Sequence, residues 1–346
     1  MKLPLINKED SDYSSLKLKV YYSNDMIPAE KKTYLTDLRH SNGPYMAAQS
    51  KSGAPHYFMD AASQIATLGL GVSPTVFMGS AHFLESWIND PNTENFKQVK
   101  KGFRDFLQRK SGFKDLTLTY CHSGAEANET ALGYCYSRRI NPKANKVLAF
   151  EGSFHGRMLV SLCSTWNKTK REPFQWEGFE TEYSFVPEDL SGKMNYNFPK
   201  EWCKVWDLAP AREFQTPDIW NDDQNIAAEV KSLLDVREKL LTKKIFSIII
   251  EPMQCEGGDR YLTNRYHSAL LVMAQSFKVP IIHDEVQTGF HLGREFFWHR
   301  ELNLKGINDE ELFPSYVVCA KKAQVGLILS PHAHQVSEIH HEFQVA

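Results

Sequence analysis

The feature that most constrains this chain is a short apolar run that ends in a carboxylate. Residues 279–283 read Val-Pro-Ile-Ile-His, Asp284 follows them, and Gly289 closes the segment. Such a run predicts a buried β-strand whose far end presents Asp284 to a cleft. In open parallel sheets, functional groups gather just beyond the carboxyl ends of the strands. Asp284 is therefore the centre of a candidate site.

Further strands alternate with helices along the chain. Strand-like runs occupy residues 116–120, 146–150, 245–250 and 314–320, with a shorter one at 57–60. Amphipathic or apolar helical patterns occupy residues 94–110, 227–241 and 266–277. This alternation favours βαβ units. The sequence therefore predicts an α/β fold with a mostly parallel sheet flanked by helices.

Composition excludes several classes of protein. The 346 residues are 42% apolar and 24% charged, as in ordinary soluble globular proteins. A formal net charge of −2 gives no electrostatic basis for binding nucleic acid or an anionic membrane. The six cysteines are scattered without a CxxC pair, and the first ten residues hold too short an apolar core for a signal peptide. We expect a reduced, cytoplasmic protein.

Two stretches invite other interpretations. Residues 61–84 carry no formal charge, but polar residues, a proline and glycines interrupt the run, so we expect a packed interface or cleft wall rather than a membrane span. The tail contains four histidines without the cysteines or carboxylates of a structural metal site, namely His332, His334, His340 and His341. We therefore predict no metal site.

The strand at 116–120 leads into a tight turn of small residues. The next residues, 121–129, read Cys-His-Ser-Gly-Ala-Glu-Ala-Asn-Glu. Ser123 with Glu126 forms the pattern of a capping box, which predicts that a helix begins here. A helix amino terminus after a strand can bind phosphate through its unpaired N–H groups. The alternative is a well-capped helix without a ligand.

The strand at 146–150 is followed by a loop with chemically useful side chains. Two glycines bracket Phe154 and His155, and Arg157 follows the second glycine. Phe154 could stack on a flat ring, and Arg157 could bind a carboxylate with both arms of its guanidinium. The alternative is a surface loop with a solvated arginine.

Two more strands end in ionisable residues. The run at 245–250 is followed by Glu251, and the run at 314–320 is followed by Lys321 and Lys322. An amine at the end of a buried strand is a candidate Schiff-base nucleophile.

Together these stretches resemble the class III (omega) aminotransferases, which use pyridoxal 5′-phosphate. The resemblance covers about residues 40–330, and it rests on five motifs in this order: SGAEA at 123–127, FHGR at 154–157, EPMQ with EGG at 251–258, DEVQTG at 284–289 and AKK at 320–322. The segments EGGDR at 256–260 and KKAQ at 321–324 are most similar to the branch with L-lysine 6-aminotransferase and 4-aminobutyrate aminotransferase.

The resemblance implies roles around the cofactor ring. Asp284 would pair with the pyridine nitrogen, and a protonated ring is the electron sink of this chemistry. Val286 would pack beneath the ring and Phe154 above it. Gln287 would bind the ring hydroxyl, and His155 would line the ring.

The resemblance also implies the remaining contacts. The N–H donors for the phosphate would come from Ser123, Gly124 and Ala125, and Glu251 would orient the groups that contact the cofactor. Lys321, which follows the small residue Ala320, would form the Schiff base and move the proton.

Two further residues would bind or balance the substrate's charge. Arg157 would bind a substrate carboxylate. Glu256 would neutralise a second arginine from a C-terminal domain.

The resemblance further implies a domain plan. Residues 1–60 would belong to a small domain, residues 61–330 would form the large domain with a seven-stranded-type sheet, and residues 331–346 would be a tail. Members of the family continue for roughly 100 residues beyond the lysine. We therefore expect the C-terminal small domain, and with it the second carboxylate clamp, to be absent. Residues 305–310 have the character of a surface insertion.

The function implied is transfer of a terminal amino group from an omega-amino acid or diamine, lysine-like or 4-aminobutyrate-like, to 2-oxoglutarate. The enzyme would act as a homodimer. Two alternatives stay open: a truncated or inactive homologue, and a racemase or aminomutase on the same scaffold.

Overall fold

The computed structural model describes residues 34–50, 55–60, 66–71, 94–174, 180–189, 193–196 and 224–331. Most of the uncharged run at 61–84 and the histidines of the tail lie outside these residues. The chain divides into two compact units, Met1–Val99 and Lys100–Ala346. The boundaries predicted at residues 60 and 330 stay predictions.

The first unit contains a three-stranded antiparallel sheet. Its strands are β1 (Tyr34–Asn42), β2 (Tyr45–Ser50) and β3 (Pro55–Met59), in that order. The short strand predicted near residue 57 is therefore present as β3. Met46, Ala47 and Ala48 of β2 are buried.

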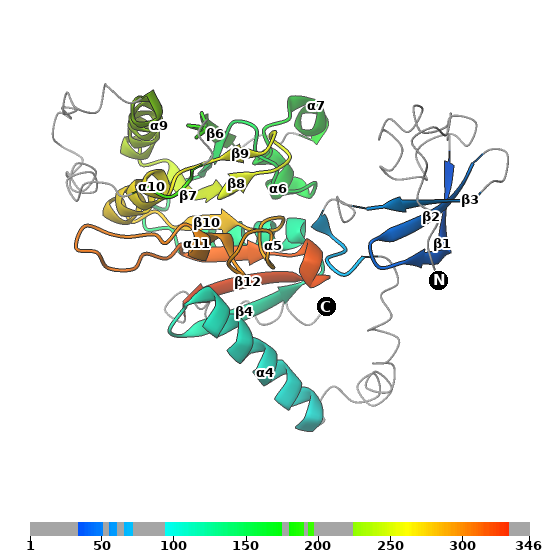
Figure 1. The fold of residues 1–346 in the computed structure, drawn as a ribbon. Helices are drawn as coiled ribbons and strands as arrows, with labels where there is room; N and C mark the ends of the chain where they lie inside the picture. Colours follow the sequence, from blue (N-terminus) through cyan, green and yellow to red (C-terminus); the bar gives the residue numbers. More distant parts are fainter. Residues whose placement is uncertain are drawn as a thin grey trace. The chain divides into compact units, whose positions relative to one another are not determined.

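The second unit is built on a seven-stranded sheet with the order β4-β12-β11-β10-β7-β5-β6 (Figure 1). The strands are β4 (Leu116–Cys121), β5 (Lys146–Phe150), β6 (Glu180–Ser184), β7 (Ile245–Ile250), β10 (Ile281–Asp284), β11 (Tyr316–Cys319) and β12 (Gly326–Pro331). A separate pair, β8 (Met253–Gln254) and β9 (Arg260–Tyr261), follows β7.

Strand direction decides where the site forms. β6, β5, β7, β10 and β11 pair in parallel, and β12 is antiparallel to both β11 and β4. β4 consequently runs in the same direction as the other five, and β12 alone is reversed. The carboxyl ends of β4, β5, β7, β10 and β11 therefore lie at one edge of the sheet, which confirms the mostly parallel α/β fold.

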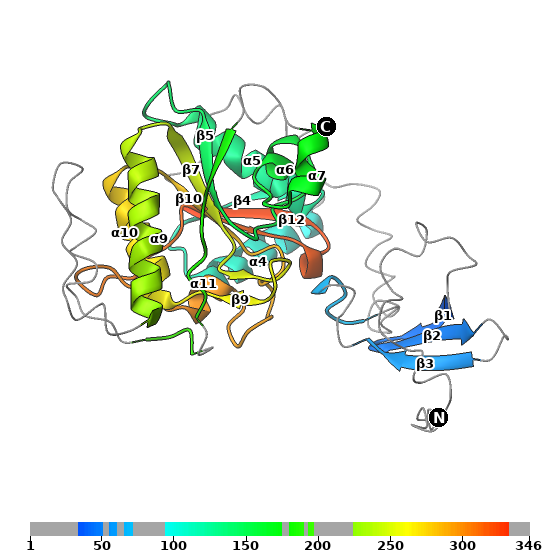
Figure 2. The same cartoon turned by 90° about the horizontal axis from the view of Figure 1, so that it is seen from above.

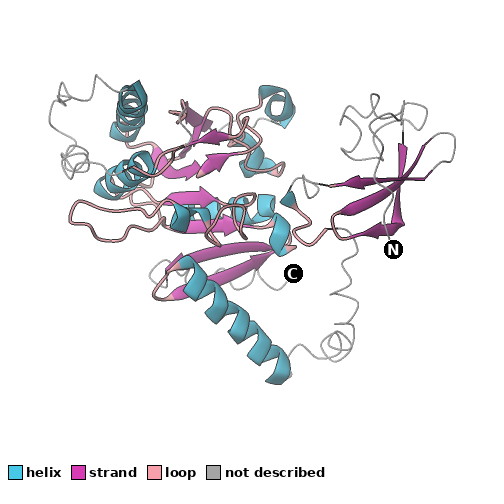
Figure 3. Ribbon diagram, viewed as in Figure 1, coloured by secondary structure: helices cyan, strands magenta, loops and turns pink. Residues whose placement is uncertain are grey.

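Helices cover both faces, as Figure 3 shows with the strands in magenta and the helices in cyan. α5 (Gly124–Ser137) packs on one face, against alternate strand residues such as Val147, Ile249 and Val318. α9 (Gln224–Leu241) and α10 (Asn264–Ser276) lie side by side on the other face, over Leu148 and Ile248 (Figure 2). This alternation is the two-residue period of a β-strand.

Further helices complete the second unit. Leu107 of α4 (Glu94–Ser111) packs with β11 and β12 residues such as Val317 and Leu327. The short helices α6 (Leu159–Cys163), α7 (Lys168–Arg171) and α11 (Trp298–Glu301) connect the strands. Two single-turn 3-10 helices, η3 (Glu172–Phe174) and η5 (Lys321–Ala323), follow α7 and β11.

The predicted helices α4, α9 and α10 and the predicted strands are present within a few residues of their expected bounds. Six strands were not predicted, namely β1, β2, β6, β8, β9 and β12. Among the described residues, no helix has both the length and the apolar character needed to cross a membrane.

Candidate active site

Asp284, the last residue of β10, is the best-supported polar group at the strand edge. Its Oδ2 accepts hydrogen bonds from Asn128 Nδ2 and from His155 Nδ1, each at 2.7 Å. Its Oδ1 accepts a hydrogen bond from the Val286 N–H at 3.1 Å. Because a carboxylate only accepts, His155 carries its proton on Nδ1 here. Three segments, α5, the loop after β5 and the turn after β10, therefore hold one carboxylate.

These hydrogen bonds leave one acceptor position of the Asp284 carboxylate unoccupied. A carboxylate offers about four acceptor positions, and the three bonds fill two on Oδ2 and one on Oδ1. Asp284 is only 4% exposed, so bulk water does not fill the remaining position. The Oδ1 atom can therefore accept one more donor from a bound group.

Glu251 lies at the end of β7 and supports the neighbouring loop. Its Oε1 accepts a hydrogen bond from the Phe154 N–H at 2.8 Å, and the residue is buried. Burial raises the pKa of Glu251 well above its usual value, and the nearby charge of Asp284 adds to this effect. Glu251 thus positions the loop that carries Phe154 and His155.

Two amines meet on Gln287. Lys321 Nζ donates to Gln287 Oε1 at 2.6 Å, and Lys322 Nζ donates to the Gln287 main-chain oxygen at 3.0 Å. Burial lowers the pKa of both amines below the usual lysine value. For Lys321, four acidic groups act in the opposite direction, namely Cys255, Asp284, Glu256 and Glu251. The carboxyl end of β11 therefore presents two amines that both contact Gln287.

The amino terminus of α5 reaches the same place. Ser123 caps the helix, since its Oγ accepts a hydrogen bond from the Glu126 N–H at 3.2 Å. Glu126 reaches back to the His122 N–H at 2.7 Å, one residue before the N–H that an ordinary capping box uses. A Cβ on Gly124 would lie 2.7 Å from both methyl carbons of Val286. Only glycine lets Val286 pack against this helix end.

A rim of exposed charges surrounds Phe154. The guanidinium of Arg157 lies 6.0 Å from the centre of the Phe154 ring, and Lys170 Nζ lies 4.8 Å from it. Lys170 Nζ also donates to Glu256 Oε1 at 2.8 Å. The rim thus brings two cations and one carboxylate to the aromatic residue of the site.

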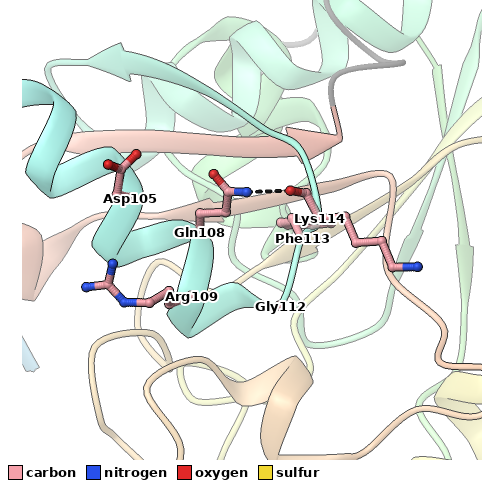
Figure 4. Close-up of a pocket in the computed structure, with 6 residues that line it drawn as sticks. All are labelled: Asp105, Gln108, Arg109, Gly112, Phe113 and Lys114. Carbon is pink, nitrogen blue, oxygen red and sulfur yellow. Dashed lines mark hydrogen bonds between the residues drawn. The ribbon is translucent and has the colours of Figure 1, made fainter.

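A hollow of about 470 Å³ opens beside this rim, and Phe154, Trp166, Glu256 and Arg260 are among the residues that line it. Figure 4 shows a second hollow, of about 500 Å³, at the end of α4, where Gln108 donates to the main-chain oxygen of Lys114. None of the predicted site residues lines that second hollow.

Comparison with known proteins gives the family. The family model for class-III aminotransferases matches residues 28–335. The chain belongs to the class-III aminotransferases. This family uses pyridoxal 5′-phosphate, so the cofactor inferred from the resemblance is confirmed at the level of the family.

The chain is similar to several curated class-III aminotransferases. Mitochondrial acetylornithine aminotransferase of Candida glabrata is 34% identical over 50% of this chain and 31% of that protein. L-lysine-epsilon aminotransferase of Mycobacterium tuberculosis is 25% identical over 87% of this chain and 63% of that protein. 4-aminobutyrate aminotransferase of Emericella nidulans is 24% identical over 87% of this chain and 60% of that protein. The chain thus spans less than two thirds of the length of these relatives.

Solved structures share the fold. Lysine aminotransferase from M. tuberculosis superposes with a TM-score of 0.67 at 21% identity, over 89% of this chain and 66% of that one. A PLP-bound aminotransferase mutant from Vibrio fluvialis superposes with a TM-score of 0.64 at 18% identity, over 95% of this chain and 67% of that one.

The residues present fit the cofactor of the family. Two buried polar atoms, His155 Nε2 and Asn128 Oδ1, have no hydrogen-bond partner among the described residues. Asp284 Oδ1 keeps an acceptor position on the same carboxylate. Buried polar groups without partners are rare in proteins, and a polar ligand would satisfy them.

The structure brings together most of the residues that the sequence singled out. Asp284, Glu251, His155 and the amine of Lys321 converge on one edge of the sheet, and Phe154, Arg157 and Glu256 form the rim. Among the described residues, no group of three or more side chains could hold a metal ion. The five described cysteines are free.

Sequence reasoning missed Asn128 and Lys170. Asn128 lies one helical turn after Gly124 on the same face of α5, and this spacing could have identified it. Lys170 lies in a region without periodic pattern, and no signal in the sequence marked it.

Proposed function

We propose that this protein is a pyridoxal-phosphate-dependent aminotransferase that moves a terminal amino group from an omega-amino acid or diamine to 2-oxoglutarate. The observation that carries the proposal is the convergence of Asp284 and Lys321. A buried carboxylate with one open acceptor position and an amine of lowered pKa lie at the same strand ends. Family membership gives the reaction class.

Each residue has a role that its contacts support. Asp284 would hold the pyridine nitrogen and favour its protonated form, and the cofactor would supply an electron sink when bound. Asn128 and His155 hold that carboxylate in place. Lys321 would hold the cofactor and move a proton to and from the substrate, because its lowered pKa leaves more of the amine neutral.

The remaining predicted residues complete the site. The first N–H groups of α5, at Ser123, Gly124 and Ala125, bind the phosphate. Val286 and Phe154 would contact the cofactor ring, and Gln287 would hydrogen-bond to it. Arg157 binds a substrate carboxylate. A homodimer in the cytoplasm is the proposed state of the protein.

The experiment is a donor screen with 2-oxoglutarate as the acceptor. L-lysine, ornithine, 4-aminobutyrate and α-amino acids are incubated with the loaded protein, and glutamate is measured together with the oxidised donor. We expect glutamate from donors with a terminal amine. Rearranged or racemised donor without glutamate would establish a mutase or racemase instead, and no reaction of any donor would establish an inactive homologue.

A further inference from the structure

A second buried carboxylate, Glu285, directly follows Asp284, and the proposed function does not use it. Glu285 is fully buried, and so is its partner His299 in α11. His299 Nδ1 donates to Glu285 Oε1 at 2.7 Å. Removing two charged groups from water is costly, and an apolar pair of similar volume is often as stable. Stability alone therefore does not account for the pair.

The hydrogen bonds of the pair show where its protons lie. His299 Nε2 lies 2.9 Å from the main-chain oxygen of Ser111, which can only accept. The Glu285 carboxylate also accepts from the main-chain N–H groups of Trp298 at 2.6 Å and His299 at 2.8 Å. Because the carboxylate accepts at each of these contacts, His299 carries a proton on both ring nitrogens. Its positive charge thus balances Glu285 beside the charge of Asp284.

The two neighbouring carboxylates are held from opposite sides of the sheet, since successive residues of a strand point to opposite faces. Asp284 is held by α5 and by the loop after β5. Glu285 is held by α11 and, through His299, by Ser111 at the end of α4. The Glu285 N–H also donates to the Val318 carbonyl of β11 at 2.7 Å. The turn after β10 is therefore fixed on both sides.

This turn leads from Glu285 to the group that contacts both amines. Its main-chain oxygen accepts from the Gly289 N–H at 2.9 Å, which closes the turn around Gln287. Gln287 in turn accepts hydrogen bonds from Lys321 Nζ at 2.6 Å and from Lys322 Nζ at 3.0 Å. A shift of the Glu285 side chain would therefore move Gln287 relative to the two amines.

We propose that Glu285 and His299 are positioning residues, which hold the turn after β10 so that Asp284 and Gln287 keep their places at the strand edge. The bond from His299 Nδ1 to Glu285 carries this role, whereas the bond from Nε2 to Ser111 attaches α4. The inference rests on the proposed function for the roles of Asp284 and Gln287 toward the cofactor.

Two substitutions of His299 separate its two bonds. In His299→Asn the side-chain amide can take the place of Nδ1 and keep the bond to Glu285. In His299→Gln the amide can take the place of Nε2 and keep the bond to Ser111. Each variant loses the ring and one buried hydrogen bond, so denaturant titrations should give similar losses of stability for both. A third variant, Glu285→Gln, offers one acceptor oxygen where the carboxylate offers two.

The first measurement is the dissociation constant of pyridoxal 5′-phosphate, from absorbance titrations of the unloaded protein. We expect the affinity to fall about 10-fold in His299→Gln and in Glu285→Gln, and less than about 2-fold in His299→Asn. Equal losses in the two His299 variants would make the pair merely structural and would overturn the inference. Unchanged affinity in His299→Gln would overturn it as well.

The second measurement needs no cofactor. Trace acetylation of the unloaded protein, followed by peptide mass mapping, gives the reactivity of each lysine. In the two variants that lose the positioning bond, Lys321 and Lys322 should react about 5-fold faster, because a displaced Gln287 no longer holds their amines. Lys146, which pairs with Glu182 of β6, is the internal control and should not change. Unchanged reactivity of both site lysines would contradict the inference.

The two measurements separate this inference from the proposed function. If the protein takes up no cofactor, the proposed function fails, and the lysine reactivities alone decide the positioning role. If the donor screen yields glutamate but the two His299 variants behave alike, the proposed function stands and the inference fails.

Discussion

The buried base of the site and its exposed rim are built in opposite ways. At the base, Asp284 is almost fully buried, and three hydrogen bonds from three elements fix it. At the rim, Arg157 and Glu256 are exposed; Arg157 lies over the Phe154 ring, and Glu256 forms an ion pair with Lys170. The rigid base is suited to bind a cofactor that stays in place, and the exposed rim is suited to bind successive substrates.

The largest expected effect tests the amine at the base. In Lys321→Ala the loaded protein should lose its visible Schiff-base absorption, and borohydride should no longer fix the cofactor to the chain, because the covalent anchor is gone. Lys322→Ala is the matched comparison, since both amines contact Gln287, and it should retain both signals. A reduced adduct that maps to Lys322 would transfer the anchoring role to that residue.

The second effect tests the carboxylate at the base. Asp284→Asn keeps the volume but removes the charge, and it offers one acceptor oxygen to three donors. We expect the rate of the half-reaction with the amino donor to fall by about 10²–10³-fold, as measured by stopped-flow absorbance. Asp259→Asn, on an exposed turn, is the control. Near-normal rates in Asp284→Asn would show that the carboxylate does not contact the cofactor.

The third effect concerns the histidines behind the base. His267 and His283 are fully buried with their rings 5.1 Å apart, and burial lowers the pKa of His267 to about 4 and that of His283 well below the usual value. Below about pH 6.5 the unfolded chain binds protons that the folded chain excludes. The free energy of unfolding should therefore fall between pH 6.5 and 4, by about 3 kcal/mol for His267 alone.

Denaturant titrations at several pH values measure this loss. His283 has no hydrogen-bond partner among the described residues, so His283→Leu should reduce the acid sensitivity without lowering stability at neutral pH. His291→Gln, at an exposed position, should leave the pH profile unchanged. An unaltered profile in His283→Leu would show that this ring does not contribute.

The smallest effect tests the rim. In Arg157→Gln the loss of a charged carboxylate contact should cost about 2 kcal/mol, or roughly 30-fold in kcat/KM, for donors with a carboxylate. Simple amines without a carboxylate should show little change, because they make no such contact. Steady-state kinetics on both kinds of donor provide the measurement. Equal losses for both would indicate damage to folding rather than to binding.

The base could be predicted from the sequence and the rim only in part, for a physical reason. Apolar, β-branched runs can be recognised as buried strands from the sequence. Because parallel strands end at the same edge of the sheet, Asp284, Glu251 and Lys321 are then expected to lie close together. Asn128 was overlooked because a single polar residue in a helix has many ordinary explanations. Lys170 meets Glu256 only through the tertiary path of the chain, which local composition does not encode.

The reversed strand was missed for a related reason. The run Gly326–Pro331 is apolar, but it follows the lysine loop so closely that neither its existence nor its direction could be separated from the loop. The chain turns back from β11 into β12 because β12 then forms antiparallel pairs with both β11 and β4. Only the tertiary structure determines this turn.

The position of β12 between β4 and β11 determines when β4 can pair during synthesis on the ribosome. Among the strands that the structure describes, β4 pairs only with β12, so this edge of β4 has no partner in the sheet until Gly326–Pro331 has been synthesised. At about 5–20 residues per second, β4 waits about 10–40 s after its own synthesis. The turn with Ser123 and the loop with Lys321 are brought together only when this last pairing forms. The nascent chain thus carries an unpaired strand edge during that interval, and chaperones that shield such edges should be required most at that time.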